Sequence, residues 1–157
     1  MVPRGYGDWA VTEEAVAAML CVVGAVVARI RRVFYVHQGA TNTAVGALEL
    51  RFTDGRLLLV DSGPDGEALA VAAHEWEDPF TEDRMTPENR SFVTTSGKWT
   101  AVDLSNSPEY EGFLGAVVLE IAPIMSANGK IVGAILGTSN GDIRAEVEAD
   151  DLYVQVG

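Results

Sequence analysis

Residues 119–149 read LEIAPIMSANGKIVGAILGTSNGDIRAEVEA, in which two Asn-Gly pairs separate three apolar runs. Asn-Gly tolerates the positive φ that a two-residue hairpin turn of type I′ requires. A turn at Asn128-Gly129 pairs Ile121 with Leu136, and a turn at Asn140-Gly141 pairs the same Leu136 with Ala145. Because both turns give the shared strand the same apolar face, the stretch predicts a three-stranded antiparallel meander.

A third pair, Asp54-Gly55, lies between two further strand-like runs. As a two-residue turn it pairs Leu48 with Asp61, which places Asp61 on the apolar face of the hairpin and Leu58 on the opposite face. One such pair is weak evidence of a hairpin, whereas three with strand-like flanks predict a chain built mainly of antiparallel sheet.

The two hairpin regions share a short pattern. Val45-Gly46-Ala47-Leu48 leads into the Asp-Gly hairpin, and Val132-Gly133-Ala134-Ile135 leads into an Asn-Gly hairpin. The likeness favours either an internal repeat or two meanders that are alike only in composition. In both cases the two β-units span about 33–74 and 98–157, and with no linker between them we expect one domain over 1–157.

An unbroken apolar run at residues 15–28 precedes the first expected strand. Thr12 can cap a helix there, and the flanking acidic and basic side chains complement the helix dipole. The run is shorter than the ~20 residues of a spanning helix, and it lacks the leading positive charge of a secretory signal. Thr86-Pro87 and Ser107-Pro108 each open a short helix or turn. The predicted fold class is therefore α+β, a single domain of mainly antiparallel hairpin meanders with one long N-terminal helix and one or two short helices.

The chain of 157 residues is strongly acidic, with a net charge of −12 and a pI near 4.4. This charge repels phosphate and argues against nucleic-acid binding. The single cysteine, Cys21, excludes an intramolecular disulfide framework and a cysteine-rich metal site. With no membrane or targeting segment predicted, the expected location is the cytoplasm.

Negative charge is concentrated in residues 65–88, which hold eight acidic side chains and one basic one. The densest part, residues 74–80, adds a histidine and two aromatic rings to three carboxylates. Such a surface either only keeps the protein in solution or recognises a basic protein partner, since complementary charge speeds encounter. The candidate binding residues are Glu75, Trp76, Glu77, Asp78, Phe80, Glu82, Asp83 and Trp99.

Few side chains are suited to acid–base catalysis, and no nucleophile elbow, phosphate loop or dinucleotide fingerprint is present. His74 or Asp61 could act as a general acid or base beside an aromatic pocket near Trp76 and Trp99. The competing interpretations are that the aromatic rings anchor a loop to the core and that Asp61 accepts hydrogen bonds in a turn. We expect neither a metal ion nor a cofactor.

The reverse face of the C-terminal meander carries an apolar stripe with a charged rim, which is typical of a protein contact and makes a homodimer one candidate. The alternative is that the N-terminal helix covers this face, with Gly133 and Gly137 allowing its close approach. The candidate interface residues are Ile124, Ile131, Ile135, Arg144, Glu146 and Glu148.

The strings Trp76-Glu77-Asp78-Pro79-Phe80 and Ser96-Gly97-Lys98-Trp99, on a small acidic chain rich in hairpins, resemble small uncharacterised bacterial domains, some of which are grouped with immunity proteins of polymorphic toxin systems. The resemblance implies a bacterial binding protein and transfers no functional residue. With the acidic charge, it favours an immunity-like, non-enzymatic protein that recognises a basic protein partner. The alternative is a small-molecule enzyme or binder of the cyclase, isomerase or hydrolase type.

Overall fold

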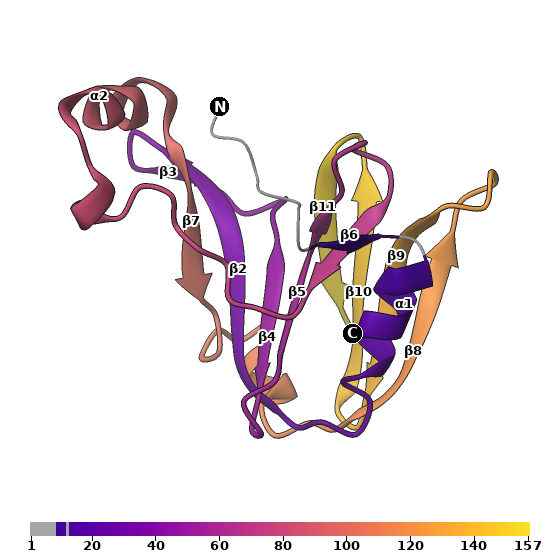
Figure 1. Ribbon diagram of the computed structural model, residues 1–157. Helices are drawn as coiled ribbons and strands as arrows, with labels where there is room; N and C mark the ends of the chain where they lie inside the picture. Colours follow the sequence, from indigo (N-terminus) through magenta and orange to yellow (C-terminus); the bar gives the residue numbers. More distant parts are fainter. Residues whose placement is uncertain (1–8, 12) are drawn as a thin grey trace.

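The computed structural model describes residues 9–11 and 13–157, which form two antiparallel sheets with one core between them (Figure 1). The seven-stranded sheet contains β1 (Ala10–Val11), β2 (Val27–His37), β3 (Ala40–Asn42), β4 (Leu48–Phe52), β5 (Leu57–Ser62), β6 (Leu69–Ala72) and β7 (Lys98–Asp103). The four-stranded sheet contains β8 (Val118–Met125), β9 (Ile131–Thr138), β10 (Gly141–Glu148) and β11 (Asp151–Val156). The helices are α1 (Glu13–Leu20) and α2 (Pro87–Ser96), with 3-10 turns η1 (Glu82–Arg84) and η2 (Glu111–Phe113). The predicted α+β class, mainly antiparallel sheet, is confirmed.

The core lies between the two sheets. Leu50 of β4 and Leu58 of β5 are fully buried in one cluster with Leu136 of β9. Helix α1 adds Ala15 and Met19 to the same cluster and contacts β6 and β8, so it closes one side of the sandwich. Each large aliphatic side chain removed from water contributes about 1.5–3 kcal/mol, which makes this cluster the main stabilising feature of the fold.

Helix α1 ends at Leu20, well before the end of the apolar run from which it is built. Gly24 has a φ of 90°, and its N–H donates to the Val118 carbonyl at 2.7 Å. Val26 and Val27 then continue into β2, because β-branched residues favour strands over helices. The cap predicted at Thr12 lies outside the described residues. Among the described residues, none of the helices has the length and apolar character to cross a membrane.

Strand β2 is the longest and pairs with three others: β4 through residues 27–32, β7 through 31–36 and β3 through 35–37. The connection from β3 to β4 also joins the two sheets at Gly46. The Gly46 N–H donates to the carbonyl of Leu152 in β11 at 3.0 Å, and the Gly46 carbonyl accepts from the guanidinium of Arg32 at 3.0 Å. Arg32 is buried and also donates to the Tyr110 hydroxyl, so polar bonds cross the core at this point.

The C-terminal meander forms as predicted, with a change of register in each of its first two hairpins. Ile121 pairs with Leu136 as expected, although a register shift near Met125 accommodates a longer turn. In the next hairpin Leu136 pairs with Ile143 instead of Ala145, because the turn residues are Ser139 and Asn140. This shift of two residues leaves the paired side chains of β9 and β10 on their predicted faces.

The Asp54-Gly55 hairpin departs from its predicted register by one residue, so the predicted position of Asp61 was wrong. Phe52 accepts from the Gly55 N–H at 3.0 Å and donates to the Arg56 carbonyl at 2.9 Å, which makes a three-residue turn. The glycine has a φ of 89°, the conformation that the extra residue of such a turn requires. A one-residue shift turns Leu58 into the core and Asp61 onto the outer face of the sheet.

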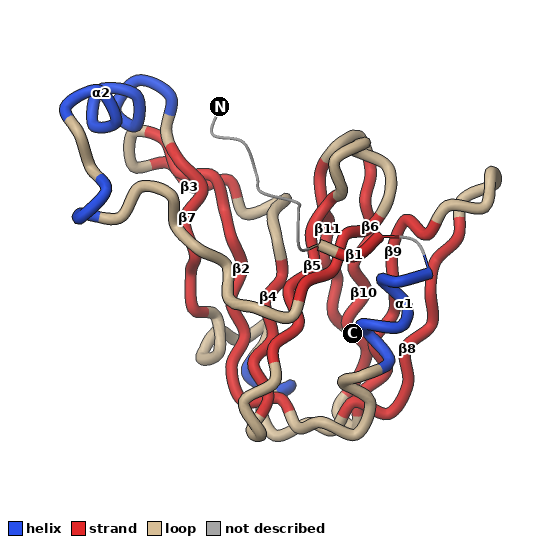
Figure 2. The backbone as a smooth tube through the Cα atoms, viewed as in Figure 1, coloured by secondary structure: helices blue, strands red, loops and turns tan. Residues whose placement is uncertain are grey.

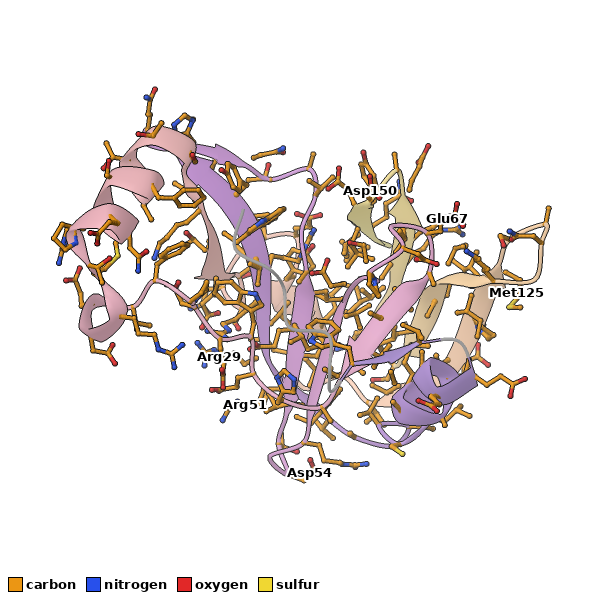
Figure 3. All side chains as sticks on the ribbon, turned by 45° about the horizontal axis from the view of Figure 1, so that its top comes forward. Arg29, Arg51, Asp54, Glu67, Met125 and Asp150 are labelled. Atoms are coloured by element: carbon orange, nitrogen blue, oxygen red, sulfur yellow. The ribbon has the colours of Figure 1, made fainter. Side chains whose placement is uncertain are left out.

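Asp65 and Lys130 connect the turn between β5 and β6 to the tip of the β8–β9 hairpin. The Lys130 ammonium lies 3.1 Å from the Asp65 carboxylate and 2.7 Å from that of Glu67. The Asp150 N–H donates to the Gly66 carbonyl at 3.1 Å, so Glu67 and Asp150 lie at the same end of the molecule (Figure 3). The backbone N–H groups of Ala68 and Glu67, with a smaller contribution from Lys130, lower the pKa of Asp65 from 3.8 to about 2.

An Asp65→Asn substitution is expected to reduce the loss of stability in acid. Because the Asp65 pKa is lower in the folded chain, its carboxylate stabilises the fold above about pH 4, and this contribution is lost as the pH falls towards about 2. The side chain is 45% exposed, so the contribution is below about 1 kcal/mol. Urea unfolding at pH 6 and pH 3 measures the contribution of the Asp65 carboxylate, and Glu148→Gln, at an exposed position, is the control. Equal acid sensitivity in Asp65→Asn and wild type would contradict the expectation.

Candidate ligand-binding groove

The outer face of the seven-stranded sheet carries a second apolar cluster. Side chains alternate along a strand, so Ala47 and Leu59 face outward next to the inward Leu48 and Leu58. They are buried there with Val33 and Ala72, under partly buried side chains of Trp9, Trp76, Trp99 and Ala101. The three tryptophans, which are all that the chain contains, therefore lie on one face of one sheet.

Above this cluster lies an open groove of about 890 Å³, called here the tryptophan groove. Its aromatic lining consists of Trp9, Tyr35, Trp76, Phe80, Phe92 and Trp99. The ring centroids of Tyr35 and Trp99 are 5.4 Å apart in an edge-to-face arrangement. A groove of this size, lined by six aromatic rings together with apolar and polar side chains, has the features of a binding site.

One wall of the groove is the long connection from β6 to β7, which crosses the outer face of the sheet before it reaches α2 (Figure 2). The Trp76 N–H donates to the buried carboxylate of Glu49 at 2.8 Å. Further along, the Lys98 ammonium lies 2.7 Å from the Asp78 carboxylate. The rings of Phe80 and Phe92 then stack with centroids 5.8 Å apart, which attaches α2 to the wall.

The charged and titratable side chains that line the groove are Asp61, His74, Glu77, Arg84, Lys98 and Asp151. Asp61 is 5% exposed and accepts from the Ser62 N–H at 2.8 Å. His74 lies edge-to-face with Trp9, at 6.1 Å between ring centroids, and its Nδ1 is 2.9 Å from the Glu75 carbonyl. The groove thus combines aromatic surface with carboxylates, one imidazole, the exposed guanidinium of Arg84 and one ammonium that is already paired.

The structure brings together six of the ten residues that the sequence predicted for binding or catalysis. Trp76, Glu77, Phe80 and Trp99 line the groove, together with the two candidates for acid–base chemistry, His74 and Asp61. The other acidic candidates lie outside it. Glu75 pairs with Arg51, Asp78 with Lys98 and Glu82 with Arg90, while a hydrogen bond from the Thr81 side chain lowers the pKa of the exposed Asp83.

The predicted interface stripe on the four-stranded sheet is only partly present. Ile131 is 6% exposed and belongs to the core, because the register shift between Ile124 and Met125 changes the face of the sheet that it occupies. Ile124 and Ile135 remain half-buried. Helix α1 does not cover this face as the alternative proposed, since it packs at the side against β6 and β8. The rim residues Arg144, Glu146 and Glu148 line a shallow hollow of about 160 Å³, and Arg144 pairs with Glu146 at 3.0 Å.

Several groove residues carry no signal that the sequence analysis used. Trp9 precedes the first helix, and Tyr35 and Lys98 lie in strands β2 and β7, which pair over a long sequence distance. Asp151 comes from β11 of the other sheet. Phe92 lies on α2, a helix without a single fully buried residue. The one available signal was the alternation of side chains along β2. Val33 and Tyr35 are two residues apart, so they lie on the same, outer face of the sheet.

Comparison of the chain with protein-family models, with curated proteins and with solved structures gives no match. In the part of the chain that the structure describes, no three His, Cys, Asp or Glu side chains are grouped so that they could hold a metal ion. The fold and the groove define the class of molecule: a mainly antiparallel α+β protein with an open aromatic groove on the outer face of its larger sheet.

Proposed function

We propose that this chain is an immunity-like, non-enzymatic binding protein that recognises a basic protein partner through the tryptophan groove. The observation that carries the proposal is the convergence of all three tryptophans on one open groove that also contains the carboxylates of Asp61, Glu77 and Asp151. Aromatic side chains in partly enclosed sites supply much of the binding energy at protein contacts.

The charge of the chain supports a basic partner, because a net charge of −12 attracts cationic surfaces over long range. Glu75, Asp78 and Glu82 each have an intramolecular cation beside them, which weakens their contribution to such a contact. Glu77 is exposed and lines the groove. We therefore place the contact at the groove instead of along the whole acidic segment. The bacterial and cytoplasmic setting stays a prediction.

A capture experiment with matched variants tests the proposal. Tagged protein is incubated at low ionic strength with extract of its own host, and a retained basic protein is then purified and its affinity measured by calorimetry. Trp76→Ala is expected to weaken binding roughly 30-fold, the effect of losing a contact worth about 2 kcal/mol. Glu148→Gln, on the outer face of the other sheet, is the charge control. A partner that binds wild type and Trp76→Ala equally would place the contact elsewhere.

A small-molecule binder or enzyme of the cyclase, isomerase or hydrolase type is the second candidate. One observation favours it: His74 and Asp61 line the same groove, whose volume is within the roughly 300–1,000 Å³ of small-molecule sites. Native mass spectrometry of protein purified from its host separates the two candidates. A retained small molecule that is lost in Asp61→Asn supports the second, and a retained basic protein without such a molecule supports the first.

A further inference from the structure

The C-terminal meander contains two Asn-Gly pairs, Asn128-Gly129 and Asn140-Gly141, whose chemistry goes beyond their role as turns. Both belong to the four-stranded sheet, whereas the tryptophan groove lies on the other sheet. We infer that Asn128 is a site of spontaneous deamidation, which converts its side-chain amide to a carboxylate, and that the fold protects Asn140 from the same reaction. The inference is independent of the proposed function.

Deamidation of asparagine uses the backbone nitrogen of the next residue as its nucleophile. This nitrogen loses its proton and attacks the side-chain carbonyl carbon, and the bond from that carbon to the amide nitrogen breaks. The amide nitrogen takes up the proton and leaves as ammonia, so that a five-membered succinimide remains. One water then opens the ring at either carbonyl, which gives aspartate or isoaspartate. Glycine has no Cβ to hinder the attack, so Asn-Gly pairs are well suited to it.

Asn128 lies at the exposed tip of the hairpin formed by β8 and β9. Ala127, Asn128 and Gly129 are exposed and lie between the two strands, at a tip that extends away from the rest of the sheet (Figure 1). In the part of the chain that the structure describes, no atom lies within 4 Å of a Cβ added at Gly129. The backbone of this turn therefore has room to form the cyclic intermediate.

The hydrogen bonds at Asn128 leave the reacting groups accessible. Its Oδ1 accepts from the Ser126 hydroxyl, and its amide nitrogen, the leaving group, has no hydrogen-bond partner among the described residues. The Gly129 N–H donates to the Ser126 carbonyl at 3.0 Å, and this bond must break before the nitrogen can attack. Because the bond belongs to an exposed turn, it opens at a low cost in free energy.

Asn140 is exposed as well, but its reacting groups are held in place. Its amide nitrogen donates to the Gly112 carbonyl at 2.8 Å. Gly141 is the first residue of β10, and a Cβ added there would lie 2.9 Å from the Gly157 carbonyl oxygen. Asp142 exchanges two backbone hydrogen bonds with the same Gly157, at 2.7 and 3.0 Å. Asn140 can therefore react only after this end of the sheet has opened.

Trypsin separates the two sites, so each asparagine is the internal control of the other. Cleavage after lysine and arginine yields residues 99–130, which contain Asn128, and residues 131–144, which contain Asn140. Folded protein is incubated at mildly alkaline pH, and mass spectrometry with fragmentation follows the conversion of each asparagine. We expect Asn128 to react at least about tenfold faster than Asn140, the ratio that follows if opening at Asn140 costs about 1.4 kcal/mol.

Incubation of the unfolded chain in guanidinium chloride is the control for intrinsic reactivity. Both Asn-Gly pairs have the same reacting groups, so the two rates are expected to converge once the fold is removed. Two matched variants give a second readout, because the carboxylate makes the protein more acidic in ion-exchange chromatography. An acidic form is expected to accumulate in wild type and in Asn140→Gln, and to be absent in Asn128→Gln, whose longer side chain does not form the five-membered ring.

Equal rates at Asn128 and Asn140 in the folded protein overturn the inference. No conversion of Asn128 in folded protein, under conditions in which the unfolded chain reacts, overturns it as well. A difference in rate that persists in guanidinium chloride has the same effect, because the local sequence and not the fold would then be its cause. The capture experiment with Trp76→Ala is unaffected by any of these results, so the proposed function stands or fails separately.

Discussion

A Gly46→Ala substitution is expected to lower the free energy of unfolding by about 4 kcal/mol. Gly46 has a φ of 144°, which side chains disfavour, and an added Cβ would lie 2.9 Å from the Val33 carbonyl carbon and closer still to its oxygen. The backbone cannot move away easily, because the Gly46 N–H and carbonyl are both bonded, to Leu152 and to the buried Arg32. Strain and steric overlap therefore add at the point where the two sheets are joined.

Equilibrium urea unfolding followed by circular dichroism measures this loss, and Gly129→Ala is the matched control. Gly129 also has a positive φ, of 82°, and no atom lies within 4 Å of an added Cβ. The control isolates the conformational cost, which is about 1 kcal/mol. Equal losses in the two variants would show that the close approach to Val33 contributes nothing.

The register of the hairpins shows how far turn chemistry could be read from the sequence. Asn140-Gly141 and Asp54-Gly55 both mark real turns, and both predicted registers were shifted. The first shift is even and leaves the faces of the β9–β10 hairpin as predicted. The second is odd and reverses the faces of β5, which is why Asp61 lies outside the core. A dipeptide locates a turn, whereas the number of loop residues depends on the strands that flank it.

The groove could be predicted only in part, because it is assembled by long-range pairing. The sequence analysis predicted an aromatic pocket near Trp76 and Trp99, and both side chains line the groove. Trp9 joins them because β1 pairs with β6 at the opposite edge of the sheet from β7. Hairpin turns specify which strands pair with their neighbours along the chain. They do not specify the pairing of strands that are distant in the sequence.

The acidic segment was predicted as a free surface, and its ion pairs were not foreseen. Arg51 of β4 and Lys98 of β7 are far from residues 74–83 along the chain and reach them only when the wall of the groove packs on the sheet. Counting charges along the sequence therefore overestimates the number of acidic side chains that remain for a partner.

Among the charged side chains, the loss of Glu49 is expected to lower the free energy of unfolding most, because this carboxylate lies beneath the wall of the groove. It follows Leu48 and precedes Leu50, a pattern that predicts a solvent-facing carboxylate, yet its side chain is 1% exposed. Both carboxylate oxygens accept from Arg31, at 2.7 and 2.6 Å, and one also accepts from the Trp76 N–H at 2.8 Å. The hydrogen bond to Glu49 raises the pKa of Arg31 above its ordinary value, so this guanidinium stays charged.

Glu49→Gln is therefore expected to lower the free energy of unfolding by about 3 kcal/mol, since it leaves the largely buried Arg31 without its counter-charge. The tryptophan emission is expected to shift to the red as well, because the wall that carries Trp76 loses its anchor on the sheet. Urea unfolding and fluorescence measure the two effects. Glu146→Gln removes a carboxylate from the exposed Arg144–Glu146 pair and is expected to cost at most about 0.5 kcal/mol with no change in emission. A loss of stability in Glu49→Gln without a change in emission would mean that the pair supports the sheet alone and does not position Trp76.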